Sequence, residues 1–150
     1  FAATQNAKIQ IFEQPSPIEK ASIMGDIANA IKIPVMADES VKSLDDIYDL
    51  AKNNFIDMVN IKLMKVGGIR EAMHINSVAR AAGLEAMVGC LDECSLGISA
   101  ALHFALSRPN IEYADLDGHL DIKDDPFNKL FIIKNGILYP NSQSGLGLVD

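Results

Sequence analysis

The sequence is poor in cysteine: Cys90 and Cys94 are the only two among 150 residues. A disulfide framework in a small secreted domain usually needs more cysteines, and a structural zinc site needs about four ligands. No neighbouring histidine or cysteine pair completes such a ligand set. We therefore expect a reduced, cytoplasmic protein.

The sequence also lacks the features that nucleic acids and membranes select. Its net charge is −7 and its lysines and arginines form no cluster, whereas a phosphate backbone needs a basic surface. No apolar run is long enough to span a bilayer, and the first 15 residues have no basic start or long apolar core of a signal peptide. We expect neither a nucleic acid nor a membrane as partner. Because the chain begins without Met and in the middle of a pattern, we expect it to start inside a larger protein.

What the sequence does contain is a regular alternation of apolar strand-like runs and amphipathic helices. The predicted strands cover residues 8–15, 33–40, 55–64, 84–90 and 110–118. The predicted helices cover residues 16–32, 43–54, 67–83 and 95–108, with Ser43 as N-cap of the second. Residues 128–141 predict a β-hairpin that turns at Asn135 and Gly136. This order predicts an α/β fold with a parallel sheet and a terminal hairpin.

Polar residues recur at the carboxyl ends of the five predicted strands, at intervals of about 25 residues. They are Glu13, Asp38, Lys62, Cys90 and Asp115. In a parallel (β/α) barrel such ends meet at one rim, which holds the active site. A complete barrel takes about 250 residues, so five strands would form a little more than half of one.

An open, doubly wound sheet is the alternative architecture. Such a sheet usually has a glycine-rich phosphate loop after its first strand. Here the first predicted strand ends in "FEQPSP", which has no glycine. We therefore favour part of a TIM-type barrel.

Glu13 and Asp38 end apolar strands, where a carboxylate is unfavourable without compensation. Two carboxylates on adjacent barrel strands can share Mg²⁺, which prefers oxygen ligands. They could equally cap helices or pair with lysines. Lys62 would lie on the same strand face as Asn60, and near a metal its pKa would fall, making it usable as an acid or base. Lys62 could instead be a solvent-exposed residue at a strand end, but Lys65 is the better candidate for that place.

Asp115 and Asp117 are two positions apart in "EYADLDG". On an extended strand they would share a face, so a positive group is needed between them.

Five motifs together carry a family resemblance. "IFEQP", "IPVMADES", "VNIKLMKVGGI", "MVGCLDE" and "YADLDG" occur in this order. In these motifs the chain closely resembles the enolase superfamily, in its muconate-lactonising branch. Within that branch the chain most resembles the dipeptide epimerases, of the L-Ala-D/L-Glu type.

The resemblance implies Mg²⁺ held by three carboxylates at successive strand ends, with Glu13 and Asp38 as two of them. It implies that Lys62 is an acid/base lysine and that Glu39 is a polar neighbour of the metal site. It further implies epimerisation of a dipeptide, by removal of the proton next to a carboxylate through a metal-stabilised enolate.

The resemblance also implies a substrate site. Asp115 and Asp117 would bind the α-ammonium group of the dipeptide. Glu93 would contact the substrate, and Cys90 and Asp92 would line the pocket.

The resemblance leaves part of such an enzyme outside the sequence. Residues 1–125 would be strands 4 to 8 of the barrel and residues 126–150 the hairpin and tail, without the N-terminal capping domain and first barrel strands. The expected partners are a dipeptide, that missing part, and optionally further copies of the protein. The alternatives are an N-acylamino acid racemase, an o-succinylbenzoate synthase or a muconate cycloisomerase of the same superfamily, or a non-catalytic half-barrel.

Overall fold

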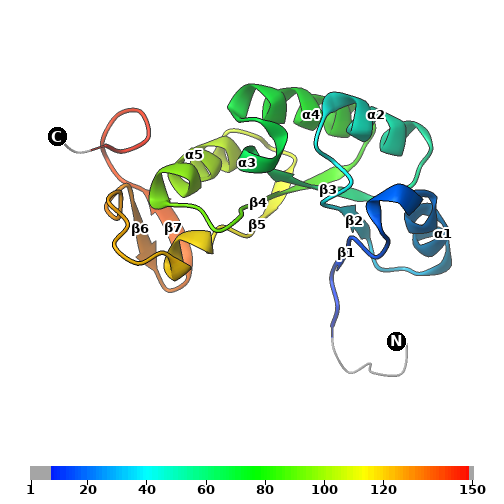
Figure 1. The fold of residues 1–150 in the computed structure, drawn as a ribbon, viewed down its shortest axis with the longest axis horizontal. Helices are drawn as coiled ribbons and strands as arrows, with labels where there is room; N and C mark the ends of the chain where they lie inside the picture. The colour runs from blue at the N-terminus through cyan, green and yellow to red at the C-terminus, as the bar shows by residue number, and fades with distance from the viewer. Residues whose placement is uncertain (1–7, 149–150) are drawn as a thin grey trace.

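A computed structural model of the chain describes residues 8–148, so the first seven residues and the last two of the predicted tail lie outside the description. Five strands form a parallel sheet in the order in which they occur in the chain (Figure 1). They are β1 (Phe12–Glu13), β2 (Val35–Ala37), β3 (Met58–Lys62), β4 (Glu85–Gly89) and β5 (Ile111–Ala114). The predicted α/β class with a parallel sheet is confirmed.

Each of the first four strands is followed by helical structure that leads to the next strand. The helices are α1 (Ser22–Ala30), α2 (Leu44–Lys52), α3 (Leu63–Val66), α4 (Ile69–Ala81) and α5 (Ser95–Leu106), and the 3-10 helices are η1 (Ile18–Lys20) and η2 (Gly118–Asp121). Figure 1 shows α2, α4 and α5 above the strands. None of the helices in residues 8–148 has the length and apolar character needed to cross a membrane.

The two faces of the sheet differ because side chains alternate along each strand. The helix-facing side chains of the three central strands join one large apolar core and are Val35, Ala37, Val59, Ile61, Ala86 and Val88. On the other face a small separate cluster contains Met36, Met58 and Met87. Asn60 and Lys62 alternate with Val59 and Ile61 and therefore lie on this second face, as predicted.

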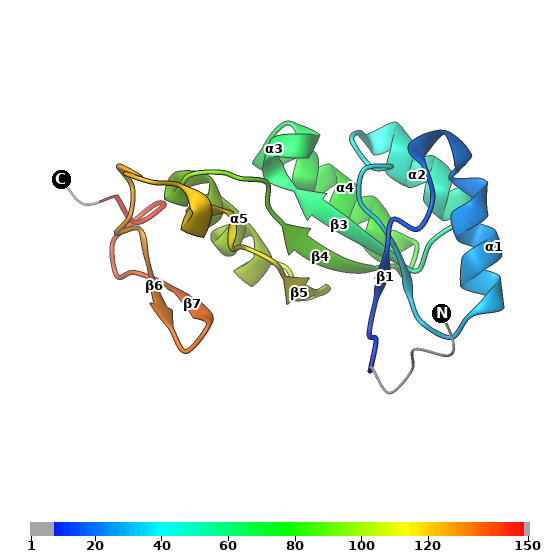
Figure 2. The same cartoon turned by 60° about the horizontal axis from the view of Figure 1, so that its bottom comes forward.

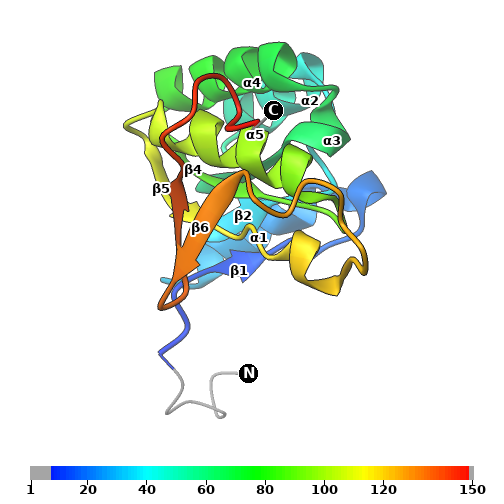
Figure 3. The same ribbon diagram turned by 90° about the vertical axis from the view of Figure 1, so that its left-hand side faces the viewer.

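The predicted hairpin is confirmed. β6 (Phe131–Lys134) pairs antiparallel with β7 (Ile137–Pro140). Asn135 and Gly136 between them both have positive φ, 54° and 76°, as a tight two-residue turn requires. The hairpin packs against α5 through β7, and Figure 1 shows it at the end of the molecule opposite α1. Figure 3 views the molecule from the hairpin end.

The predicted strands and helices all extend beyond the observed ones, and two of them differ in a way that matters for the site. The predicted helix over 16–32 is divided into η1 and α1, with Pro17 ahead of the first turn. The predicted strand over 55–64 ends at Lys62, because Leu63 begins the short helix α3. α3 ends where Gly67 and Gly68 take positive φ, 93° and 108°, which favours glycine. Figure 2 shows α3 directly beyond the end of β3.

Candidate active site

The polar residues at the ends of the first three strands line one open cavity. Glu13 is the last residue of β1, Asp38 follows β2 directly, and Lys62 is the last residue of β3. Asp115, which follows β5, lines the same cavity, as does Glu39. The parallel order of the strands therefore brings these residues of distant sequence to one rim.

Asp38 is the most buried charge of the cavity, with a side chain only 6% exposed. Its Oδ2 accepts a hydrogen bond from Nζ of Lys62 at 2.7 Å. Glu13 Oε1 accepts a hydrogen bond from Nδ2 of Asn60 at 2.8 Å. Asp38 is thus held by a lysine and Glu13 by an amide.

The cavity shifts the pKa values of its two carboxyl groups in opposite directions. Burial raises the pKa of Glu13, and the charge of Asp38 adds to this against the Asn60 hydrogen bond. Burial also acts to raise the pKa of Asp38, but hydrogen bonds from Lys62 and Lys65 outweigh it and lower that pKa. Asp38 is therefore the more firmly ionised carboxylate.

Lys62 has a raised pKa beside the groups of this chain, and the lowering expected beside a bound metal stays a prediction. Burial acts to lower the pKa, but the hydrogen bond and charge of Asp38 outweigh it, and Glu13 and Glu39 add to the rise. In the structure Lys62 is therefore a stabilised ammonium group, able to donate a proton.

The prediction that Lys65 is a solvent-exposed residue at a strand end is wrong, because Lys65 is buried and lies in α3. Its side chain is 9% exposed, and its Nζ donates to Asp38 Oδ1 at 2.5 Å. It also donates to the backbone oxygen of Asp38 at 2.5 Å and of Asn60 at 3.0 Å. The available signal was the three-residue spacing from Lys62, which puts both amines on one side once Leu63 starts a helix.

Gln14 is a second residue that the sequence did not single out. Its Oε1 accepts hydrogen bonds from the backbone N–H groups of Asp38 and Ser40, at 2.9 and 3.2 Å. Its Nε2 donates to Ser40 Oγ at 2.7 Å and to the Ser16 backbone oxygen at 2.9 Å. Gln14 thereby joins the loops that follow β1 and β2 and helps to place Asp38.

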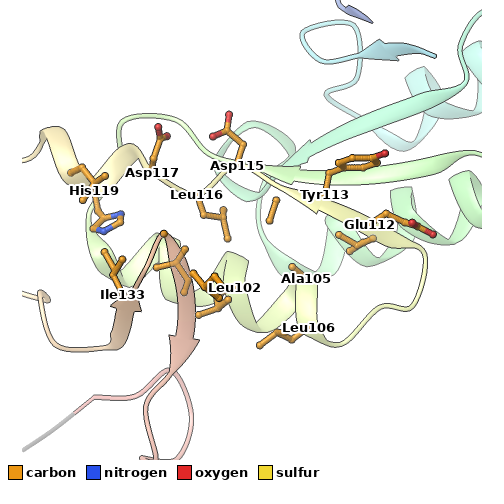
Figure 4. A pocket seen from close by; sticks show the side chains of 16 residues that line it. Leu102, Ala105, Leu106, Glu112, Tyr113, Asp115, Leu116, Asp117, His119 and Ile133 are labelled. Atoms are coloured by element: carbon orange, nitrogen blue, oxygen red, sulfur yellow. The ribbon is translucent and has the colours of Figure 1, made fainter. Parts of the chain in front are cut away.

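Asp115 and Asp117 lie just beyond β5, and Asp117 is the residue that precedes η2. Both are exposed, whereas Leu116 between them is 5% exposed and packs into the core. Figure 4 shows the two carboxylates pointing to the same side, with Leu116 pointing away from them. They are placed to act together on one positively charged group.

A second cavity contains these two aspartates together with Cys90, Asp92 and Met64. Asp115 lines both cavities, so it joins the aspartate pair to the Glu13–Asp38–Lys62 cluster. Cys90 Sγ accepts a hydrogen bond from the backbone N–H of Gly118 at 3.3 Å. This bond ties the loop after β4 to the loop after β5.

Glu93 is not placed with these residues. Its side chain folds back on its own loop, where Oε1 accepts a hydrogen bond from the backbone N–H of Leu91 at 3.2 Å. Glu93 is 7% exposed and touches Gly97, where only a glycine leaves room for the carboxylate. It lines neither of the two cavities.

The donor chemistry of the first cavity fits a hard divalent cation in part. Glu13 and Asp38 supply carboxylate oxygens, the ligands that Mg²⁺ prefers, and their mutual repulsion would be relieved by a cation. Within residues 8–148 no group of three or more His, Cys, Asp or Glu side chains could hold a metal ion. These two carboxylates therefore fit as part of a ligand set rather than a complete one.

Comparison with known proteins shows the family to which the chain belongs. The family model described as "Enolase C-terminal domain-like" matches residues 1–149. The L-Ala-D/L-Glu epimerase of Bacillus subtilis is 38% identical over 141 residues, which are 94% of this chain and 38% of the relative. The L-Lys-D/L-Arg epimerase of Methylococcus capsulatus is 39% identical over 146 residues, which are 97% of this chain and 41% of the relative.

The solved structures include a dipeptide epimerase from Methylococcus capsulatus complexed with Mg and the dipeptide L-Arg-D-Lys. It superimposes with a TM-score of 0.92 at 38% identity, over 99% of this chain and 42% of that one. The chain thus spans about two fifths of the length of the relatives it matches.

Proposed function

The chain belongs to the enolase C-terminal domain-like family, and from this membership we propose that it is the C-terminal part of a Mg²⁺-dependent dipeptide epimerase, an isomerase. The observation that carries the proposal is the single cavity lined by Glu13, Asp38, Lys62 and Asp115. The relatives' names support it, since they are epimerases, and one was solved with Mg and a dipeptide.

The proposal divides the enzyme between this chain and a further segment. Residues 1–125 would supply strands 4 to 8 of a TIM-type barrel, and residues 126–150 the hairpin and tail. The further segment would supply the first strands, the capping domain, the remaining metal ligand and an opposite-face lysine. Free Cys90 and Cys94 support the cytoplasm as its location.

Glu13 and Asp38 would hold the cation, with Glu39 as a polar neighbour. Bound Mg²⁺ would supply the positive charge that stabilises negative charge developing on a substrate carboxylate. Lys62 would move the proton: its Nζ lies in the same cavity and can donate a proton to, or in its neutral form accept one from, the α-carbon. One of the two lysines would remove the α-proton, and a lysine on the opposite face would return a proton from its own side. This would invert the stereocentre.

Asp115 and Asp117 would bind the α-ammonium group of the dipeptide. Neither forms an ion pair with a lysine, arginine or histidine in the described part of the chain, whereas Asp38 has two. A pair of carboxylates without an internal cation suits an external one. We assign a substrate of the L-Ala-D/L-Glu type, with Cys90 and Asp92 bordering it.

Glu93 takes a different place in the proposal. Its contacts to Leu91 and Gly97 make it a brace of the loop that carries Cys90 and Asp92. Contact between Glu93 and substrate would require the loop to rearrange.

Incubating the complete protein with Mg²⁺ and L-Ala-L-Glu in D₂O tests the reaction. We expect deuterium to appear at one α-carbon and the epimer to form. NMR monitors both changes. The Lys62→Ala variant should lose both, by about 10²-fold or more. Turnover that survives this change would refute the role of Lys62, and a wild type without exchange would refute the proposed epimerisation of this dipeptide.

The Asp115→Asn/Asp117→Asn variant separates dipeptides from N-acylated substrates. N-acylamino acids, o-succinylbenzoate precursors and muconate have no free ammonium group. We expect dipeptide activity to collapse in this variant. Retained dipeptide activity, or equal loss on acylated substrates, would refute the assignment to dipeptides.

A further inference from the structure

The proposed function gives Lys65 no role, although its amine is fully hydrogen-bonded inside the site. Its Nζ donates to three oxygens: Oδ1 and the backbone oxygen of Asp38, and the backbone oxygen of Asn60. The side chain is 9% exposed, so the amine is held inside rather than at the cavity mouth. An ammonium group has three donor hydrogens, and all three have acceptors here.

Asn60 makes the equivalent contact to the other carboxylate. The residue is 1% exposed, and its Nδ2 donates to Glu13 Oε1 at 2.8 Å. Room for its amide comes from Gly89 on β4, since a Cβ at that position would lie 2.5 Å from Asn60 Oδ1. Asn60 and Lys65 also bond to each other through the Asn60 backbone oxygen. One connected unit at the β3–α3 junction therefore contacts both carboxylates.

We propose that Lys65 and Asn60 are positioning residues that hold Asp38 and Glu13 in the orientation in which the two carboxylates share a divalent cation. Each brace binds one oxygen of its carboxylate, Oδ1 of Asp38 and Oε1 of Glu13, and so limits rotation of the group. Outer partners of this kind orient metal ligands, and their loss typically weakens metal binding about 10- to 100-fold. The inference rests on the proposed function, because it assumes the cation.

The positive charge of Lys65 should weaken cation binding, whereas its hydrogen bonds to Asp38 should strengthen it by orienting the carboxylate. A buried ammonium group next to Asp38 repels a cation, so its removal would tighten cation binding if charge alone mattered. Orientation and charge therefore predict changes of opposite sign in the affinity. Asn60 has no charge, so its substitution reports orientation alone.

The test uses Mn²⁺, which takes the same oxygen ligands as Mg²⁺ and has an EPR spectrum sensitive to its surroundings. Titrations of the complete protein compare wild type, Lys65→Met and Asn60→Leu, with Lys52→Met on the exposed face of α2 as control. We expect Mn²⁺ to bind about 10- to 100-fold more weakly to both site variants and its EPR spectrum to change. The control should match the wild type. Metal-free circular dichroism at the titration temperature confirms folding.

The possible outcomes separate the two proposals. Unchanged or tighter Mn²⁺ binding by the folded site variants, beside a wild type that binds Mn²⁺ and epimerises dipeptides, would overturn only the positioning roles. A wild type that binds no Mn²⁺ would overturn both. If Lys65→Met fails to fold, Asn60→Leu decides alone.

Discussion

Glu93 is, with Glu13, one of two carboxyl groups whose burial should make the stability of this chain depend on pH. Burial raises the pKa of Glu93, and the hydrogen bond from Leu91 offsets only part of the rise. The unfolded chain therefore loses this proton at a lower pH than the folded chain. Between the ordinary and the raised pKa the unfolded state binds fewer protons, so the free energy of unfolding falls as the pH rises.

The Glu93→Gln variant should lose the part of this decline that Glu93 causes. Gln keeps an oxygen for the Leu91 N–H but does not ionise, so at pH 7 the variant should be at least as stable as the wild type. The difference between the wild-type and Glu93→Gln curves cannot exceed about 1.4 kcal/mol per pH unit, because the two proteins differ by one titrating proton. Urea denaturation between about pH 4 and pH 8 measures it. The exposed change Glu19→Gln is the control, and parallel curves for Glu93→Gln and wild type would contradict the assignment.

The residues around Asp38 show which part of a site a sequence can reveal. The recurrence of polar residues at strand ends predicted that Glu13, Asp38 and Lys62 would meet, because parallel strands share one rim. The roles of Lys65 and Gln14 depend on where a single turn begins and on side-chain rotamers, which leave no periodic signal. The direction of the Lys62 pKa depends on a 2.7 Å contact, which is equally invisible in the sequence.

At the scale of elements, helix starts were predicted best where capping chemistry is explicit. Ser43 is the N-cap of α2 as predicted: its Oγ accepts from the Asp46 N–H, and the Asp46 carboxylate accepts from the Ser43 N–H. Helix α3 was missed, because its four residues are too few to show a 3.6-residue period. Long amphipathic helices and capped helix starts can therefore be predicted from the sequence, whereas short connecting turns cannot.

Removing the Ser43 cap should weaken the chain measurably. In the Ser43→Ala variant the Asp46 N–H loses its partner, which should lower the free energy of unfolding by about 1 kcal/mol. Urea denaturation measures the loss. Ser22→Ala is the matched control, because this exposed serine begins α1, where no side-chain cap bond is present. Equal effects of the two changes would contradict a specific contribution from the cap.

At the scale of the molecule, the five-stranded sheet has one well-packed face and one sparsely packed face. The helix side holds the large core, whereas the other face buries only Met36, Met58 and Met87, besides the polar residues of the site. Within residues 8–148 no strand pairs with the outer edge of β1 or of β5. Unpaired edges and an uncovered face are what a partial barrel would present to the segment that completes it.

An apolar groove follows the open edge at β5. It lies between α5, β5 and the β6–β7 hairpin and is lined by apolar side chains, among them Leu106, Tyr113, Leu116 and Ile133 (Figure 4). Leu106 is 64% exposed and Ile133 48% exposed. Exposed apolar patches beside a free strand edge favour association.

We therefore expect the isolated 150-residue chain to self-associate at micromolar concentration. We also expect it to catalyse no epimerisation, because the proposed function assigns it only two of the metal-binding carboxylates and one of the two acid/base lysines. Sedimentation velocity measures the association. Ile133→Lys places a charge in the groove and should shift the chain toward monomer. Ile132→Lys is the matched control, because Ile132 is exposed but does not line the groove. Equal effects of the two lysines would contradict association through the groove. A monomeric wild type or measurable turnover would contradict the proposal that a further segment completes the barrel, because a complete barrel has neither a free edge nor a missing ligand.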